Sequence, residues 1–300
     1  MTAEAAVLPR SHIGDTIRNY VALTKPRVIV LLLVTTVPAM VVADHGWPST
    51  WLVLATLLGG TLSAGGANAI NCWYDRDIDA IMKRTRSRPL VTGEVAPAQG
   101  LAFGISLGAG AFLFLWATTT PVAALLSLTA LLFYVFVYTI WLKRRTPHNI
   151  VIGGAAGAFP PMVGWAAVTG DISLAPLVMF AIIFFWTPPH FWALSLRLRN
   201  DYADAGVPML PVTDGPEVTR AQILRYSVML VAVSLLLGPA GELRWIYFAT
   251  ALVTGGIFVA MAFKLFRAPE RTPPMSLYKY SLLYLAVMFV AMGVDAAIFS

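Results

Sequence analysis

Apolar residues gather in nine long segments that are separated by short polar stretches. Each segment holds about 20 mainly apolar residues, the length that an α-helix needs to cross the hydrocarbon core of a bilayer. The expected spans are residues 24–43, 50–72, 98–118, 121–142, 149–169, 173–195, 222–240, 245–265 and 278–299. The pattern predicts an all-α polytopic membrane protein, with an N-terminal tail at 1–20 and a single membrane domain at 21–300.

The composition agrees with this pattern. Of the 300 residues, 58% are hydrophobic and 12% are charged, which is too apolar for a soluble chain of this length. The net charge of +6 could indicate a nucleic-acid partner. However, the basic residues lie in short loops between apolar segments, where membrane orientation explains them. We therefore expect a lipid bilayer around the chain and no nucleic acid.

The basic residues also predict the orientation of the chain. Twenty of the 21 Lys and Arg residues fall in the N-terminal tail, in the even-numbered loops or at the helix ends beside them, and Arg244 is the exception. By the positive-inside bias, the N-terminus and these loops face the cytoplasm, and Ser300 lies outside. We expect a multi-pass protein of the inner (cytoplasmic) membrane whose polar clusters all lie on the cytoplasmic side.

A polar cluster follows the second span. Asn71, Asp75 and Asp79 are four residues apart, so on a helix they share one face, and Asp77 points away from it. Two carboxylates on one face repel unless a cation lies between them, and these oxygen donors suit Mg²⁺ with substrate phosphates. The neighbouring basic residues could neutralise such phosphates; they are Lys83, Arg84 and Arg88. The alternative is a solvated helix end with mixed charges.

A second acidic cluster follows the sixth span. Asn200, Asp201 and Asp204 repeat the same residue types in a looser spacing, beside Arg197 and Tyr202. Two acidic patches that face each other across a bundle could hold a metal–diphosphate complex between them. The alternative is that Asn and Asp here only form turns.

Further candidates for substrate binding lie at the fourth junction and in the sixth span. Lys143, Arg144 and Asn149 could contact a substrate, although membrane orientation would also explain the two charges. His190 lies within a span. It could bind a carbonyl group freed by a helix break, or act as an iron ligand or a proton acceptor.

Proline pairs and small residues predict a central cavity. Pro160-Pro161 and Pro188-Pro189 fall inside the fifth and sixth spans, which we expect them to break or kink. The freed carbonyl groups are tolerated only beside a protein-lined or wet cavity, which we expect to open to the cytoplasm. Small residues crowd 59–67 and 153–158. They are typical of close helix packing, and they could instead leave room for a bulky flat ligand.

The motif of Asn71, Asp75 and Asp79 resembles N-x-x-x-D-x-x-x-D of the UbiA superfamily of membrane prenyltransferases. Longer strings at 68–79, 83–90, 146–157, 186–192 and 201–211 resemble its heme-farnesylating branch. The resemblance implies a nine-helix UbiA-type bundle that uses Mg²⁺ to transfer farnesyl from farnesyl diphosphate to a vinyl group of protoheme IX. Water is then added, and a heme A synthase is a candidate partner. One departure is Arg197, which stands where many members have the first acid of a second D-x-x-x-D motif.

The resemblance assigns roles to the polar residues. It implies Asn71, Asp75 and Asp79 as metal ligands, joined by Asp201 and Asp204, with the basic residues after Asp79 neutralising the leaving diphosphate. Two rival functions stay open. One is a sister prenyltransferase that acts on an aromatic quinone precursor. The other is an ion-coupled secondary transporter, in which paired aspartates and broken helices line a pathway.

Overall fold

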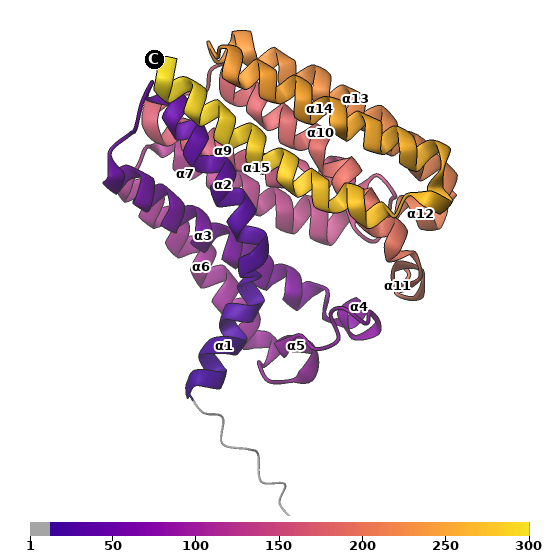
Figure 1. Cartoon of the computed structure of the whole chain (residues 1–300). Coiled ribbons are helices and arrows are strands. Elements are labelled where there is room, and N and C mark those ends of the chain that lie inside the picture. The colour runs from indigo at the N-terminus through magenta and orange to yellow at the C-terminus, as the bar shows by residue number, and fades with distance from the viewer. Residues whose placement is uncertain (1–12, 300) are drawn as a thin grey trace, which may run out of the picture.

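The computed structural model describes residues 13–299, and within them the chain folds into helices and connecting loops without strands. Figure 1 shows long helices packed side by side, with α1, α4, α5 and α11 at one end and the C-terminus at the other. Residues 1–12 of the expected tail, and Ser300, lie outside the described residues.

The element bounds follow the hydrophobic pattern closely. The long helices are α2 (Pro26–Ala43), α3 (Thr50–Tyr74), α6 (Pro97–Thr118), α7 (Pro121–Leu132), α9 (Ala155–Thr169), α10 (Leu174–Arg197), α13 (Gly215–Ala240), α14 (Trp245–Arg267) and α15 (Pro274–Phe299). The short elements are α1 (Ile13–Thr24), α4 (Arg76–Ile81), α5 (Pro89–Thr92), π-helix η1 (Phe133–Leu142), α8 (Asn149–Gly153), α11 (Arg199–Asp204), α12 (Leu210–Thr213) and the 3₁₀ turn η2 (Pro269–Arg271). Nine segments within residues 13–299 are long and apolar enough to span a bilayer, as predicted.

The structure adds detail to two expectations about individual helices. The chain forms a helix, α1, over part of the expected tail, because its apolar side packs Leu23 into the core and Tyr20 edge-on against Phe103. Both proline pairs lie within continuous helices, α9 and α10, rather than at breaks. The fifth span is instead interrupted at Gly154, between α8 and α9.

The small residues of α3 and α9 serve both expected purposes, which are close helix packing and room for a ligand. A Cβ at Gly66 would lie 2.7 Å from the backbone oxygen of Gly104, so glycine is required where α3 crosses α6. Gly60 and Gly157 have open space around them and line a cavity. Close packing and room for a ligand therefore coexist.

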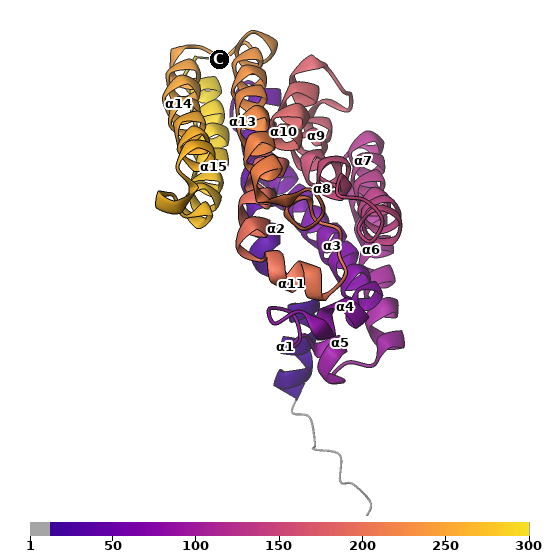
Figure 2. The ribbon, with the colours of Figure 1, turned by 90° about the vertical axis from the view of Figure 1, so that its right-hand side faces the viewer.

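Among the long helices, the wall of this cavity is built by α2, α3, α7, α9, α10 and α15. α2 packs against α9 and α15, and α10 packs against α13 and α15. A cluster of Ile78, Met82, Tyr202, Val207 and Met209 joins the loop after α3 to the loop after α10. The side view shows these two loops as neighbours at the end of the bundle that carries α1 (Figure 2). The two acid-bearing loops thus meet through apolar side chains.

Candidate active site

Asn71, Asp75 and Asp79 lie together at the junction of α3 and α4. α3 ends at Tyr74, and Asp75 leaves helical geometry with ψ near 4° before α4 begins. The three residues are 2%, 0% and 3% exposed, so none belongs to a solvated helix end. Asp77 points the other way, with 62% of its side chain exposed, as its spacing predicts.

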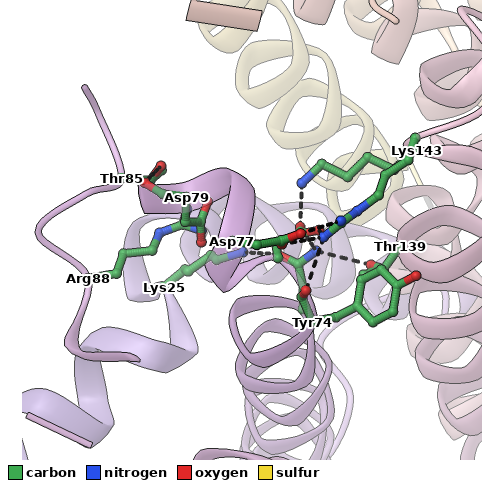
Figure 3. A network of polar contacts seen from close by, with 11 residues as sticks. Lys25, Tyr74, Asp77, Asp79, Thr85, Arg88, Thr139 and Lys143 are labelled. Atoms are coloured by element: carbon green, nitrogen blue, oxygen red, sulfur yellow. Dashed lines mark hydrogen bonds and ion pairs between the residues drawn. The ribbon is translucent and has the colours of Figure 1, made fainter. Parts of the chain in front are cut away.

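Each buried polar residue of this motif has a cationic partner. Figure 3 shows this network of polar contacts, with Lys25, Lys143, Asp79 and Arg88 labelled. The Lys25 ammonium donates to Asn71 Oδ1 at 2.6 Å. Lys143 pairs with Asp75 and Arg88 pairs with Asp79. Buried carboxylates need such partners because an unpaired charge in a low dielectric is costly.

The π-helix η1 brings Lys143 and a further partner, Thr139, into place. The Lys143 amide donates to the carbonyl of Tyr138, five residues earlier, at 2.9 Å, which is the bond of a π-turn. One turn earlier on η1, the hydroxyl of Thr139 accepts from Asn71 Nδ2 at 3.1 Å. Asn71 also donates to Asp75 Oδ2 at 2.7 Å. π-helical segments often mark functional sites, and this one places a hydroxyl and an ammonium on the acidic motif.

Arg144 lies on the outer side of the motif. Its guanidinium donates twice to Asp77 at 2.6 Å and lies 4.8 Å from the centre of the Tyr74 ring. The hydrogen bonds from Arg144 lower the pKa of Asp77 to about 2. Arg144 also reaches Asp75 Oδ1 at 3.5 Å. The sequence suggested substrate contact, whereas the structure places Arg144 against Asp75 and Asp77, and it is not among the residues that line the cavity.

The motif borders a cavity of about 660 Å³. Its polar end is lined by Lys25, Asn71, Asp79, Arg84, Arg88 and Lys143. The rest of the wall is mostly apolar and aromatic, and it includes Tyr134 and Tyr138 of η1 and Trp186, His190 and Tyr278. Sites for organic ligands have this composition, with a few polar groups in an apolar wall.

The other candidate residues occupy several positions. Lys83 is exposed, and Arg84 is exposed at the mouth of the cavity. Asn149 is fully buried, and its side-chain amide donates to the Thr146 carbonyl at 2.6 Å. It therefore holds the loop before α8 and is not a residue of the cavity wall.

The second acidic cluster lies on α11 and does not line the cavity. Asp204 is exposed, Asp201 is half-buried, and Arg197 is exposed at the end of α10. Tyr202 alone of this segment lines the cavity, and burial raises its pKa to about 12. α11 thus presents a phenol to the cavity.

The residues at the end of α3 fit a magnesium ion. No group of three His, Cys, Asp or Glu side chains lies together among residues 13–299. Mg²⁺, however, commonly uses one or two carboxylates and completes its shell with water and substrate phosphates. Asp75 Oδ1 is buried and accepts no hydrogen bond, and Asp79 lines the cavity. Two carboxylates and an amide are a suitable hard donor set.

Sequence reasoning missed Lys25 as a site residue and counted it only toward orientation. It has the left-handed conformation with φ 54° and ψ 61°, although it precedes Pro26. Both the Cβ and the following proline disfavour that conformation, and such strain is often found at functional sites. Burial lowers the pKa of Lys25 to about 8. The dipeptide Lys25-Pro26 at the start of a span was the available signal.

Comparisons with known proteins agree with the fold and the motif. Residues 32–291 match the model of the UbiA prenyltransferase family. The chain is 53% identical to "Protoheme IX farnesyltransferase" of Clavibacter sepedonicus, over 93% of this chain and 92% of that protein. It is 54% identical to "Protoheme IX farnesyltransferase 1" of Saccharopolyspora erythraea, over 98% and 95%.

A solved structure shows the same architecture. The structure of a UbiA homolog from Archaeoglobus fulgidus bound to DMAPP and Mg²⁺ superposes with a TM-score of 0.66. The match covers 94% of this chain and 100% of the homolog at 19% sequence identity, so it is a likeness of fold. Together, the family match over most of the chain, the high identity to curated relatives and the shared bundle show that this protein belongs to the UbiA prenyltransferase family.

Proposed function

We propose that this protein transfers a farnesyl group from farnesyl diphosphate to a vinyl group of protoheme IX, adds water and gives heme O and diphosphate. The observation that carries the proposal is one cavity with a cation-rich, carboxylate-bearing end and an aromatic body. The curated relatives, which are more than 50% identical and are named protoheme IX farnesyltransferase, support heme as the acceptor.

In this mechanism the polar end binds the diphosphate. Asn71, Asp75 and Asp79 would hold Mg²⁺, and the UbiA homolog bound to DMAPP and Mg²⁺ supports a metal-dependent reaction. Bound there, the ion would supply Lewis-acid neutralisation of the leaving group. Lys25 and Arg88 line the same end and donate to phosphate oxygens. Arg84 on the following loop would add positive charge at the mouth, and Lys83, exposed beside it in the sequence, would add to the charge of that loop.

The reaction then proceeds in the apolar part of the cavity. The bond between farnesyl C1 and the diphosphate oxygen breaks, and the diphosphate leaves with the electron pair. The terminal carbon of a heme vinyl group bonds to C1, and the positive charge moves to the vinyl carbon next to the porphyrin. Water adds to this carbon and releases a proton. The rings of Tyr134 and Tyr138 lie on the cavity wall, where their π faces stabilise the allylic cation.

The remaining assignments follow the same model. Asp201 and Asp204 would bind a metal ion or diphosphate only if α11 moves toward the cavity, because neither lines it here. Arg197 and Arg144 would contact heme propionates or diphosphate from outside the cavity. We assign the protein to the cytoplasmic membrane with its N-terminus and the polar end of the cavity facing the cytoplasm, because the basic residues gather there. A heme A synthase would consume the product and is the proposed protein partner.

An acceptor panel tests this function. Purified protein is incubated with farnesyl diphosphate, Mg²⁺ and either protoheme IX or an aromatic quinone precursor, and diphosphate release is measured. We expect diphosphate release when protoheme IX is the acceptor and none when the quinone precursor is. The Asp75→Asn variant should release no diphosphate with either acceptor. Release only with the quinone precursor would make the protein a sister prenyltransferase. No release with either acceptor would favour the transporter.

A further inference from the structure

His190 lies in a defined aromatic setting on the cavity wall. Its ring is stacked on Trp186, one turn earlier on α10, with centroids 4.2 Å apart and planes 18° apart. It is also stacked on Tyr278 of α15, at 4.7 Å and 27°. Two nearly parallel rings at these distances cannot share one face of the imidazole. The two faces of the His190 ring are therefore covered by different residues.

Ser281 is the hydrogen-bond partner of this histidine and favours one tautomer. The Ser281 hydroxyl donates its single proton to the Tyr278 carbonyl at 2.6 Å. His190 Nδ1 lies 2.7 Å from the same hydroxyl oxygen. The arrangement in which the hydroxyl donates to the carbonyl and accepts from a hydrogen on Nδ1 satisfies both contacts at once. The Ser281 carbonyl accepts from Trp186 Nε1 at 2.8 Å, which holds the serine in place.

One edge of the imidazole remains for the cavity. The faces are covered and the Nδ1 edge is bonded, yet His190 lines the cavity. The edge that carries Nε2 is what the cavity contacts, and no residue among 13–299 forms a hydrogen bond with that nitrogen. With the hydrogen on Nδ1, Nε2 presents a lone pair. A histidine whose other nitrogen donates to an oxygen is the usual arrangement of a metal ligand.

We propose that Nε2 of His190 is an axial ligand site for the iron of a metalloporphyrin, oriented by Ser281. The proposal rests on the proposed function and specifies how that cavity distinguishes its acceptor. His190 is seven residues before Arg197, the end of α10, so the iron would lie about 10 Å inside the helix end. Gly60 and Gly157 leave open space in the same cavity for a flat ring. An aromatic acceptor without a metal has no ion for this lone pair to ligate and can at most donate a hydrogen bond to it.

Spectroscopy of the full-length protein in lipid nanodiscs tests the proposal. Ferric protoheme IX is titrated into wild type, His190→Gln and Ser281→Ala, and the Soret band and electron paramagnetic resonance spectrum are recorded. We expect an imidazole-ligated spectrum that His190→Gln loses. Glutamine can still donate to Ser281, so it removes the ligand and retains the hydrogen bond. Ser281→Ala keeps the ligand and weakens heme binding by about 10-fold, as for other hydrogen-bond partners of metal ligands.

His148→Gln is the matched control, because His148 is exposed and does not line the cavity. It should give the wild-type spectrum. His190→Ala in buffer with added imidazole should regain the ligated spectrum. An unchanged spectrum and affinity in His190→Gln would overturn the proposal. Failure of added imidazole to restore the ligated spectrum of His190→Ala would also overturn it.

A comparison of two porphyrins tests wild type without any variant. The protein should bind iron protoporphyrin IX at least about 10-fold more tightly than iron-free protoporphyrin IX, measured by quenching of tryptophan fluorescence. Equal affinities would overturn the axial site. If the protein makes farnesylated heme but shows no imidazole-ligated spectrum, the axial site is refuted and the proposed function stands. A His190-dependent spectrum without any farnesyl transfer would refute the proposed function alone.

Discussion

Substitution of Lys25 by methionine is expected to stabilise the protein and to impair its activity. The ammonium group of Lys25 donates a hydrogen bond to Asn71 Oδ1 at the polar end of the cavity. Burial is the main cause that lowers its pKa, from 10.5 to about 8. The difference of about 2.5 units corresponds to about 3 kcal/mol against the charged form in the folded protein.

Methionine removes this unfavourable charge and keeps a chain of similar length. It also leaves Asn71 Oδ1 without its donor, which costs about 1–3 kcal/mol for a buried acceptor. The remainder is a stabilisation of about 1 kcal/mol at neutral pH, or a rise of about 2–4 °C in the thermal midpoint for a protein of this size.

The pH dependence has a definite sign. Below pH 8 the lysine is protonated in both the folded and the unfolded chain. Between pH 8 and 10.5 the folded protein has released this proton and the unfolded chain retains it, so wild-type stability rises with pH in that window. Lys25→Met should lack this rise.

Activity should change in the opposite direction. A charge-assisted hydrogen bond to phosphate contributes about 1.5–3 kcal/mol, so its loss lowers kcat/KM for farnesyl diphosphate by about 10-fold to 100-fold. Wild-type kcat/KM should also fall above about pH 8, as Lys25 loses its charge. Lys25→Arg should retain activity to higher pH, because arginine keeps its charge.

Steady-state product formation and thermal unfolding in detergent, each from pH 6 to 10, measure both effects. Lys264→Met is the matched control. Lys264 is an exposed lysine in the last turn of α14, a helix end with basic residues, and it does not line the cavity. This substitution should change neither quantity. A Lys25→Met protein with a lower midpoint and less than twofold change in kcat/KM would refute the reasoning.

Three further substitutions test other parts of the structure. Asp75→Asn should lower kcat about 100-fold. It should also destabilise the protein, because Lys143 loses its counter-charge. Adding Lys143→Met should restore the thermal midpoint but not product formation. Gly60→Leu should obstruct the cavity and reduce product formation at least about 10-fold, whereas Gly110→Leu, equally free of contacts but exposed outside the cavity, should retain it. Asp295→Ala should lower stability by about 1 kcal/mol without changing KM, because its carboxylate accepts two backbone N–H groups at the start of α14.

The sequence predicted those features that depend on local pattern. Nine apolar runs predicted nine spanning segments, because length and hydropathy are properties of each segment alone. The spacing of Asn71, Asp75 and Asp79 predicted one shared face, because helix geometry is also local. The structure brings these three residues together at the cavity end.

The features that sequence reasoning missed depend on contacts between distant residues. Lys25 meets Asn71 across 46 positions, and Lys143 meets Asp75 across 68. The left-handed turn at Lys25 and the π-helix before Lys143 are stabilised by these tertiary contacts, and helix propensity alone indicates neither. The proline pairs were expected to break or kink their spans, and both pairs lie inside helices, α9 and α10, that do not break there.

The most direct test of the account is the mass of the porphyrin product. Purified protein, farnesyl diphosphate, Mg²⁺ and protoheme IX are incubated in water enriched in ¹⁸O, and the porphyrin is analysed by mass spectrometry. The proposed reaction puts one farnesyl group and one ¹⁸O atom in each product molecule and releases one diphosphate. Unmodified protoheme IX, or a farnesylated porphyrin without the label, would contradict it.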